Sequence, residues 1–223
     1  LHGKTRRQRQ MCIRDSWKDL MTYAREARDD GHILRPVVAP RPIGVMLGLN
    51  GSQNPFSGTP TYRSIEHLPL DQRVEAMSQS NIRAKILSED PVKQSTFPLI
   101  HRILFTQMFR LGSPANYTPS PEESISAMAQ NLGVTPQEMA YDILLEDQGR
   151  GFIYAPLVNY ANYTMDACAE MLDDPYSIMG LGDGGAHVGF ILDAGYPTWL
   201  ISYWNQKQKR YSIEETVRRL TSD

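Results

Sequence analysis

The chain has 223 residues, of which 41% are hydrophobic and 22% are charged, and its net charge is −2. This composition is typical of a globular domain and excludes fibrous, collagen-like and fully disordered proteins. The apolar stretches are far shorter than the roughly 18 residues of a membrane span, and the small negative charge argues against nucleic acid as a partner. We therefore expect a cytoplasmic protein that acts on a small-molecule substrate, without membrane or nucleic-acid partners. Its oligomeric state stays open.

The first 16 residues differ in character from the rest. The run from Arg6 to Ser16, RRQRQMCIRDS, is rich in Arg and Gln and has no hydrophobic periodicity. It matches the translation of a transposase-type sequencing adapter. We therefore expect residues 1–16 to be non-native and disordered, and residues 17–223 to hold the native fold. A basic arm for nucleic acid or a targeting peptide is the alternative.

Helix signals occur along the whole chain. Amphipathic spacing predicts a surface helix over Trp17 to Asp30, with Gly31 at its end. Helical patterns follow at 70–87 and at 91–109. Three capping boxes, in which a hydroxyl side chain and a Glu three residues later cap each other's backbone amides, predict further helix starts. They begin at Ser120, Thr135 and Ser212.

Strand signals alternate with helix signals, which is typical of a parallel α/β structure. Ile33 to Leu47 is apolar but contains three prolines, which predicts a short buried strand that runs into a fixed turn. Phe152 to Val158 and Tyr176 to Leu181 are also strand-like, with a helix from about Met165 to Leu172 between them. The interval from Leu47 to Tyr176 is too long for an ordinary crossover, so we expect a helical insertion at about 60–150.

A glycine-rich turn follows the last predicted strand, in the sequence YSIMGLGDGGAHV from Tyr176 to Val188. The strand delivers Asp183 and His187 into a turn that contains Gly184, where glycine lets a ligand or another backbone approach closely. The glycine spacing also fits a dinucleotide fingerprint, so a nicotinamide-dependent oxidoreductase remains an alternative. The second alternative is that the glycines serve only the structure of the turn.

A few further residues could contact a ligand. Arg41 lies between two prolines just past a strand, where it could meet a ligand anion or form a surface salt bridge. Asn159 and Tyr160 end a predicted strand and could line a pocket or form an ordinary turn. The two cysteines cannot make a thiolate zinc site, so a metal would need His and carboxylate ligands. Three histidines are scattered singly, which favours solvated or capping roles: His32, His67 and His101.

Four runs of the sequence, in this order, resemble the carboxyl-terminal part of D-aminoacylase (N-acyl-D-amino-acid deacylase) type amidohydrolases. The third of them contains GLGDGGAHVGFILDAGYPTWLISYW. Their order and spacing are more specific than any single motif, and the resemblance covers nearly all of Trp17 to Asp223. The runs are Ala39–Arg63, Glu146–Leu172, Gly180–Trp204 and Tyr211–Asp223.

The resemblance implies a metal-dependent (β/α)8 TIM-like barrel, of which this chain would be the carboxyl-terminal part. Ile33 to Leu47 would be barrel strand seven, Tyr176 to Gly182 strand eight, and the helices between them an insertion over the mouth of the active site. Asp183 would then occupy the turn after strand eight, where the family's aspartate handles the hydrolytic water. This makes Asp183 the candidate catalytic residue and metal ligand, and His187, Gly184, Arg41, Asn159 and Tyr160 the candidates for substrate binding.

The resemblance also implies a zinc cofactor. Its other ligands would come from strands one to six, with a His-x-His on strand one that this sequence lacks. The expected reaction is hydrolysis of a linear amide, an N-acyl amino acid, by a metal-activated water whose proton Asp183 passes to the leaving nitrogen. His187 would orient Asp183 or contact the tetrahedral intermediate.

Two expectations limit this hypothesis. The family's Arg for the substrate carboxylate would fall near Ile191 and Leu192, so the sequence does not support specificity for D-amino acids. We also expect the chain to be a fragment that is inactive by itself. A non-catalytic helical interaction module, formed by the insertion, remains the alternative from another class.

Overall fold

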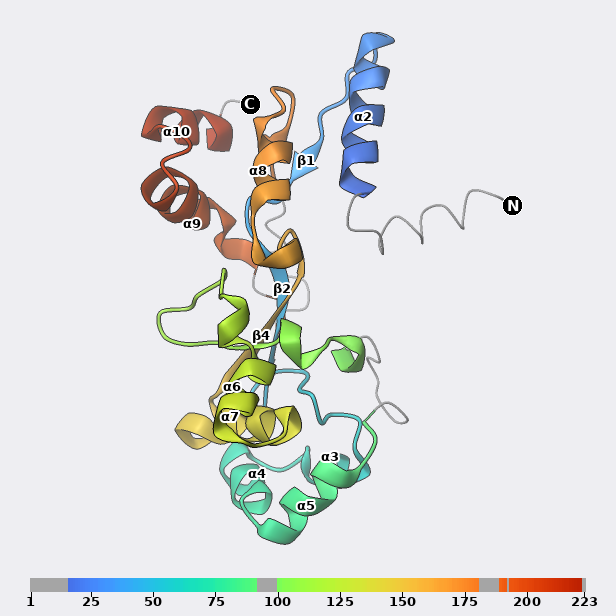
Figure 1. Cartoon of the computed structure of the whole chain (residues 1–223), viewed down its shortest axis with the longest axis vertical. Helices are drawn as coiled ribbons and strands as arrows, with labels where there is room; N and C mark the ends of the chain where they lie inside the picture. The colour runs from blue at the N-terminus through green and yellow to red at the C-terminus, as the bar shows by residue number, and fades with distance from the viewer. Residues whose placement is uncertain (1–15, 92–99, 181–188, 192, 222–223) are drawn as a thin grey trace, which may run out of the picture. The chain divides into compact units, whose positions relative to one another are not determined.

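The computed structural model describes residues 16–91, 100–180, 189–191 and 193–221 (Figure 1). The chain divides into two units, which are described separately. Unit 1 takes in Leu1–Arg41, Thr164–Gly182 and Ala194–Asp223, and unit 2 takes in Pro42–Tyr163 and Asp183–Asp193. Of residues 1–16, for which we expect disorder, 1–15 lie outside the described residues and Ser16 begins the first helix, Ser16–Asp29. The turn with Asp183, Gly184 and His187 also lies outside the described residues.

Unit 1 contains a two-stranded parallel sheet and several helices. Strand β1 (Val37–Val38) pairs with β5 (Ile178–Met179), although the two are far apart in the sequence. A Cβ added to Gly180 would lie 2.5 Å from Val37 Cγ1, so a larger residue just past β5 would displace that side chain. The helices are α2 (Ser16–Asp29), α8 (Asp166–Asp173), α9 (Tyr196–Trp199), the π-helix η6 (Leu200–Lys207) and α10 (Ile213–Thr221).

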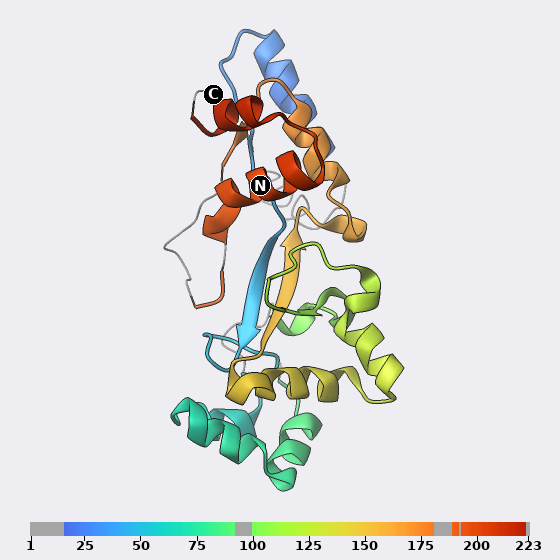
Figure 2. The same ribbon diagram turned by 90° about the vertical axis from the view of Figure 1, so that its left-hand side faces the viewer.

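Unit 2 is built on a three-stranded antiparallel sheet. Strand β4 (Phe152–Val158) lies between β2 (Ile43–Gly48) and β3 (Phe109–Arg110), and Figure 2 shows β2 and β4 side by side. The α-helices are α3 (Pro60–Ile65), α4 (Leu70–Met77), α5 (Ser80–Ser88), α6 (Ile125–Leu132) and α7 (Pro136–Gly149). Short 3-10 helices are η1 (Ile100–Arg102), η2 (Phe105–Gln107), η3 (Pro121–Glu123) and η4 (Ala161–Tyr163), and η5 (Asp193–Gly195) follows at the boundary between the units.

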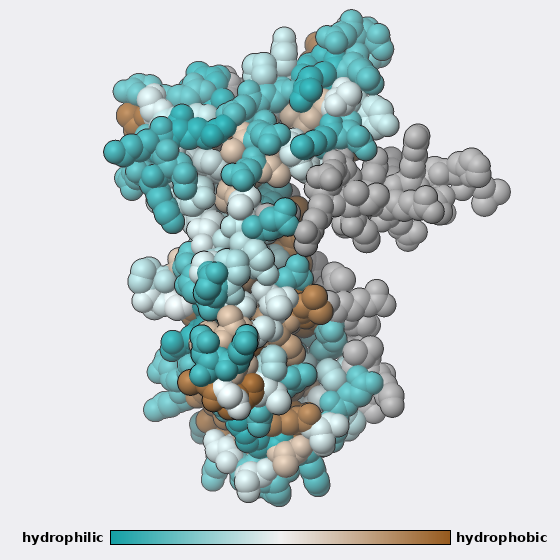
Figure 3. Space-filling view, viewed as in Figure 1, coloured by the Kyte–Doolittle hydropathy of each residue, from teal (hydrophilic) through white to brown (hydrophobic). Residues whose placement is uncertain are grey.

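The helices of unit 2 pack on the sheet through one hydrophobic cluster. Leu47 of β2, Ile153 of β4 and Ile143 of α7 are fully buried in it. Some apolar surface remains in solvent: Leu132 is 67% exposed, and Figure 3 shows hydrophobic surface at the level of α6 and α7. In unit 1, the buried residues include Cys168 and Leu172.

The predicted α/β class is confirmed as a mixed α/β fold with small open sheets, and the described residues form no closed barrel. The helix predicted from Trp17 is confirmed, and Gly31 has the left-handed φ of +87° that favours glycine after a helix. The capping box at Thr135 opens α7. At the start of α10, Ser212 Oγ accepts from Glu215 N, whereas the Glu215 carboxylate binds Arg218 and Arg219. The box at Ser120 opens only the 3-10 turn η3, after which Ser124 caps α6.

Three expectations are corrected. The stretch from Ile33 to Leu47 forms two strands, β1 and β2, because prolines interrupt it. Strand β4 pairs antiparallel to β2, because the chain leaves along β2, forms the helices and returns along β4. In the described part of 91–109, short 3-10 turns and β3 replace the predicted helix.

Candidate functional site

The described residues after the glycine-rich turn belong to unit 2 and are bonded to β2 and to the loop that follows it. Met46 N donates to Phe190 O at 2.8 Å, and Ser52 N donates to Gly189 O at 2.9 Å. A Cβ added to Gly189 would lie 1.8 Å from Ser52 Oγ and 3.1 Å from Ser52 Cβ, so a larger residue would force Ser52 to move. Residues 189 and 190 form a turn, not the helix that a dinucleotide fingerprint should open. The geometry of these residues therefore offers no support for the oxidoreductase alternative.

Arg41 is buried in unit 1, with only 3% of its surface exposed. Its guanidinium lies next to Gly195, where a Cβ would be 3.7 Å from Nη1. The hypothesis of a surface salt bridge is therefore wrong, because the side chain is not at the surface. Contact with a ligand anion stays a hypothesis.

Asn159 and Tyr160 lie at the end of β4 in unit 2. Asn159 has a left-handed φ of 61°, which marks a turn, and the Tyr160 hydroxyl donates to Pro119 O at 2.7 Å. The Tyr160 ring also meets the ring of Tyr163 edge to face, with centroids 6.3 Å apart. These contacts stabilise the turn, so Asn159 and Tyr160 form the ordinary turn that was one of their two expected roles. Arg41 belongs to unit 1, and thus no single unit holds all three residues.

The described residues do not fit a metal site by themselves. Among them, no group of three or more His, Cys, Asp and Glu residues is placed to hold an ion. The three histidines differ in exposure: His32 and His67 are exposed, whereas burial lowers the pKa of His101 below its usual range. Zinc therefore rests on the sequence resemblance alone.

Cys168 does not provide a nucleophile. Its thiol is fully buried on α8 and donates to Ala39 O at 3.2 Å. Burial raises the pKa of this thiol to about 12, which keeps it protonated at neutral pH.

Within the described residues, no helix combines the length and the hydrophobicity needed to cross a bilayer.

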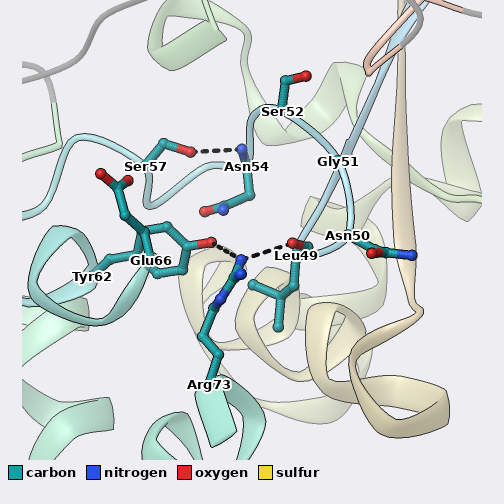
Figure 4. A pocket seen from close by; sticks show the side chains of 9 residues that line it. All are labelled: Leu49, Asn50, Gly51, Ser52, Asn54, Ser57, Tyr62, Glu66 and Arg73. Atoms are coloured by element: carbon teal, nitrogen blue, oxygen red, sulfur yellow. Dashed lines mark hydrogen bonds between the residues drawn. The ribbon is translucent and has the colours of Figure 1, made fainter. Parts of the chain in front are cut away.

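A polar pocket of about 320 Å³ opens in unit 2, beside the loop that follows β2 (Figure 4). We call it the loop pocket. Its volume is at the lower end of the range for small-molecule sites. Its lining residues come from the loop, from α3 and the turn after it, and from α4: Leu49, Asn50, Gly51, Ser52, Asn54, Ser57, Tyr62, Glu66 and Arg73.

Local hydrogen bonds hold the walls of the loop pocket in place. Asn54 Oδ1 accepts from Phe56 N at 2.9 Å, which forms an Asx turn, and Asn54 N donates to Ser57 Oγ at 2.8 Å. Arg73 crosses from α4 to the loop, where its Nη1 donates to Leu49 O at 2.8 Å and to the Tyr62 hydroxyl at 3.2 Å. The pocket is therefore preorganised by its own backbone and side chains.

Comparison with known proteins adds no relative. No protein-family model matches the chain, and neither the curated proteins nor the solved structures gave a match.

The sequence contains little that indicates the loop pocket. The loop contains the signal for a turn, with Asn, Gly, Ser and Pro from Asn50 onward. Nothing in the sequence indicates that Arg73, on a separate helix, reaches back to this loop. A donor-rich loop followed by an amphipathic helix with one inward Arg only weakly indicates a pocket, because many surface helices have that pattern.

Proposed function

We propose that this chain is part of an amidohydrolase that hydrolyses a linear amide, with an N-acyl amino acid as substrate. The sequence resemblance to N-acyl-D-amino-acid deacylases motivates the proposal. The observation that supports it best is the parallel pairing of β1 with β5, since two strands expected to be neighbours in a barrel are neighbours here.

The direction of these strands also favours the proposal. Because β1 and β5 are parallel, the residues that follow them leave from the same edge of the sheet, and Gly180 N donates to Val38 O there at 3.1 Å. Arg41 follows β1, and Asp183 follows β5 by a few residues. In barrel enzymes, catalytic residues follow the carboxyl ends of the strands.

In the proposed reaction, water adds to the amide carbon and the C–N bond then breaks, which yields an acid and an amine. The Asp183 carboxylate takes a proton from the attacking water and returns it to the leaving nitrogen. His187 orients Asp183 or contacts the tetrahedral intermediate, and Gly184 lets the substrate approach the turn. Zinc enters through the resemblance only, and none of these steps is assigned to it.

The substitution Asp183→Asn tests the role of the carboxylate in the complete parent protein. Asn keeps the size of Asp but cannot accept a proton, and a positioned acid–base group contributes about 10²- to 10⁴-fold to the rate. We expect kcat for N-acyl amino acids to fall by that factor while the melting temperature stays nearly unchanged. Near-normal turnover with a lowered melting temperature would show that Asp183 only bonds the turn.

The parent gene provides an independent test. We expect the sequence upstream of Trp17 to encode a His-x-His on a first strand, as the resemblance implies. A parent sequence without such a motif would exclude the zinc-dependent form of the proposal.

A further inference from the structure

Asn54 carries a side-chain hydrogen-bond donor that no described residue uses. Only 2% of its surface is exposed, and the Phe56 amide fixes Oδ1 as an acceptor, which leaves Nδ2 as the donor end of a side chain that lines the loop pocket (Figure 4). Among the described residues, no acceptor is bonded to this Nδ2. This Nδ2 is not among the fully buried unpartnered atoms, so it is open to the pocket, where an acceptor on a ligand can bind it.

Arg73 adds a positive charge to the same pocket. No carboxylate of the described residues forms an ion pair with it, and its Nη atoms bond carbonyl oxygens and the Tyr62 hydroxyl. Its Nε is buried and has no acceptor in the described part of the chain. The guanidinium thus brings a positive charge that forms no ion pair with a described carboxylate. Because its Nη atoms already bond protein oxygens, it attracts a ligand carboxylate through its charge.

Glu66 sets a second condition on the ligand. Its exposed side chain lies at the rim of the loop pocket and forms no ion pair with a described residue. A carboxylate there repels a second negative charge but attracts an ammonium group. The pocket therefore offers donors at Asn54 and Arg73 and an acceptor at Glu66.

We propose that the loop pocket binds a small carboxylate that also carries an ammonium group, of which a free amino acid is the simplest example. Its carboxylate would accept from Asn54 Nδ2 near the Arg73 guanidinium, with its ammonium group toward Glu66. The volume of about 320 Å³ suits a ligand of this size. The site lies wholly within unit 2 and does not depend on the proposed amide hydrolysis.

The test is an NMR titration of the full chain with alanine, acetate and inorganic phosphate. The side-chain amide signals of Asn54, assigned by their loss in Asn54→Asp, report directly on the proposed contact. Asn54→Asp keeps the Asx acceptor for Phe56 but replaces the donor with a negative oxygen. Asn116→Asp is the matched control, because Asn116 Oδ1 accepts from Thr118 N at 3.1 Å in an Asx turn that does not line the pocket.

We expect alanine to shift the Asn54 amide signals saturably, and to bind about tenfold or more weakly to Asn54→Asp while Asn116→Asp binds normally. Acetate and phosphate should bind more weakly than alanine, and Glu66→Gln should remove that preference. The absence of saturable shifts with alanine would overturn the proposal, as would equal binding by wild type and Asn54→Asp. If acetate or phosphate bound as well as alanine, the assigned ligand class would be wrong.

Discussion

Unit 2 and unit 1 bury their strands to different extents. In unit 2, Leu47 on β2 and Ile153 on β4 are fully buried in one hydrophobic cluster. In unit 1, β1 and β5 pair over only two residues each, Val37 of β1 is 62% exposed, and Ile33 just before it is fully exposed. The two sheets thus differ in how much of their apolar surface the described chain covers.

The difference follows from the kind of sheet in each unit. An antiparallel sheet can be covered on one face by helices that follow directly in the sequence, as α4 to α7 do in unit 2. A parallel pair is normally buried on both faces, by crossover helices and further strands. We therefore expect unit 1 to be the less stable of the two, as the proposed origin in a larger barrel also predicts.

The largest expected effect is that of Tyr141→Ala in unit 2. The Tyr141 side chain is fully buried on α7, its hydroxyl donates to Met77 O at 2.8 Å, and its ring packs against Phe56 at 5.4 Å. Loss of this ring should lower the free energy of unfolding by about 3–5 kcal/mol. Hydrogen exchange should speed up most in residues 42–163. Tyr141→Phe, which loses only the hydroxyl, should cost about 1 kcal/mol, and equal costs for the two variants would contradict the packing argument.

Trp204→Phe probes unit 1. Trp204 is 3% exposed, and its Nε1 donates to Pro40 O at 2.5 Å, so Phe leaves a buried carbonyl without this donor. We expect a loss of about 1–3 kcal/mol, measured by urea unfolding followed by circular dichroism. The control is Trp17→Phe, whose indole is only partly buried on α2. A control loss as large as that of Trp204→Phe would show that the hydrogen bond contributes little.

The helix caps at Thr135 and Ser212 compare the units directly. Thr135 Oγ1 accepts from Glu138 N at 3.2 Å, and the Glu138 carboxylate accepts in return from Thr135 N at 2.8 Å. Ser212 Oγ accepts from Glu215 N at 3.2 Å, but the Glu215 carboxylate binds Arg218 and Arg219. Thr135→Ala should therefore cost about 1 kcal/mol and Ser212→Ala about 0.5 kcal/mol, measured by thermal unfolding. The opposite order would show that reciprocity does not determine the strength of these caps.

The smallest expected effect concerns the pH dependence of α10. Hydrogen bonds from Arg218, and then from Arg219, lower the pKa of Glu215 to about 2 from its usual 4.5. Because the folded pKa lies below the unfolded one, this stabilisation is present above pH 4.5 and is lost as the pH falls toward 2. The side chain is at the surface, so the contribution is a few tenths of a kcal/mol.

Glu215→Gln should flatten the stability curve of the chain between pH 4.5 and pH 2. Glu170→Gln on α8 is the control, since it removes an exposed carboxylate that forms no ion pair with a described residue. If both variants changed the curve equally, the effect would belong to net charge and not to the Glu215 ion pairs.

Local signals in the sequence predicted the helices best. The capping box at Thr135, the hydroxyl cap at Ser212 and the glycine at 31 mark helix ends correctly, because a cap depends on residues three or four positions apart. The helix expected over 91–109 is wrong in its described part, where Ile125 N donates to Met108 O and the residues around Phe109 pair with β4. Periodicity alone cannot reveal such partners.

The candidate site shows the same limit. The sequence singled out Asp183, His187 and Gly184, which lie outside the described residues, and it also singled out Arg41, which is buried. It did not indicate that Asn54 and Arg73 line one pocket, because they lie on a loop and a separate helix. Their relation depends on how α4 packs against the loop after β2.

The sequence by itself determined the mixed α/β class, the helix ends and the candidate residues, since each of these depends on composition or on spacing over a few positions. Tertiary structure decided the direction of β4, the division of Ile33 to Leu47 into two strands and the assembly of the loop pocket. The physical reason is that strand pairing and pocket formation join residues far apart in the chain. Hydrogen bonds such as that from Arg73 to Leu49 O form only when the packed core brings their partners together.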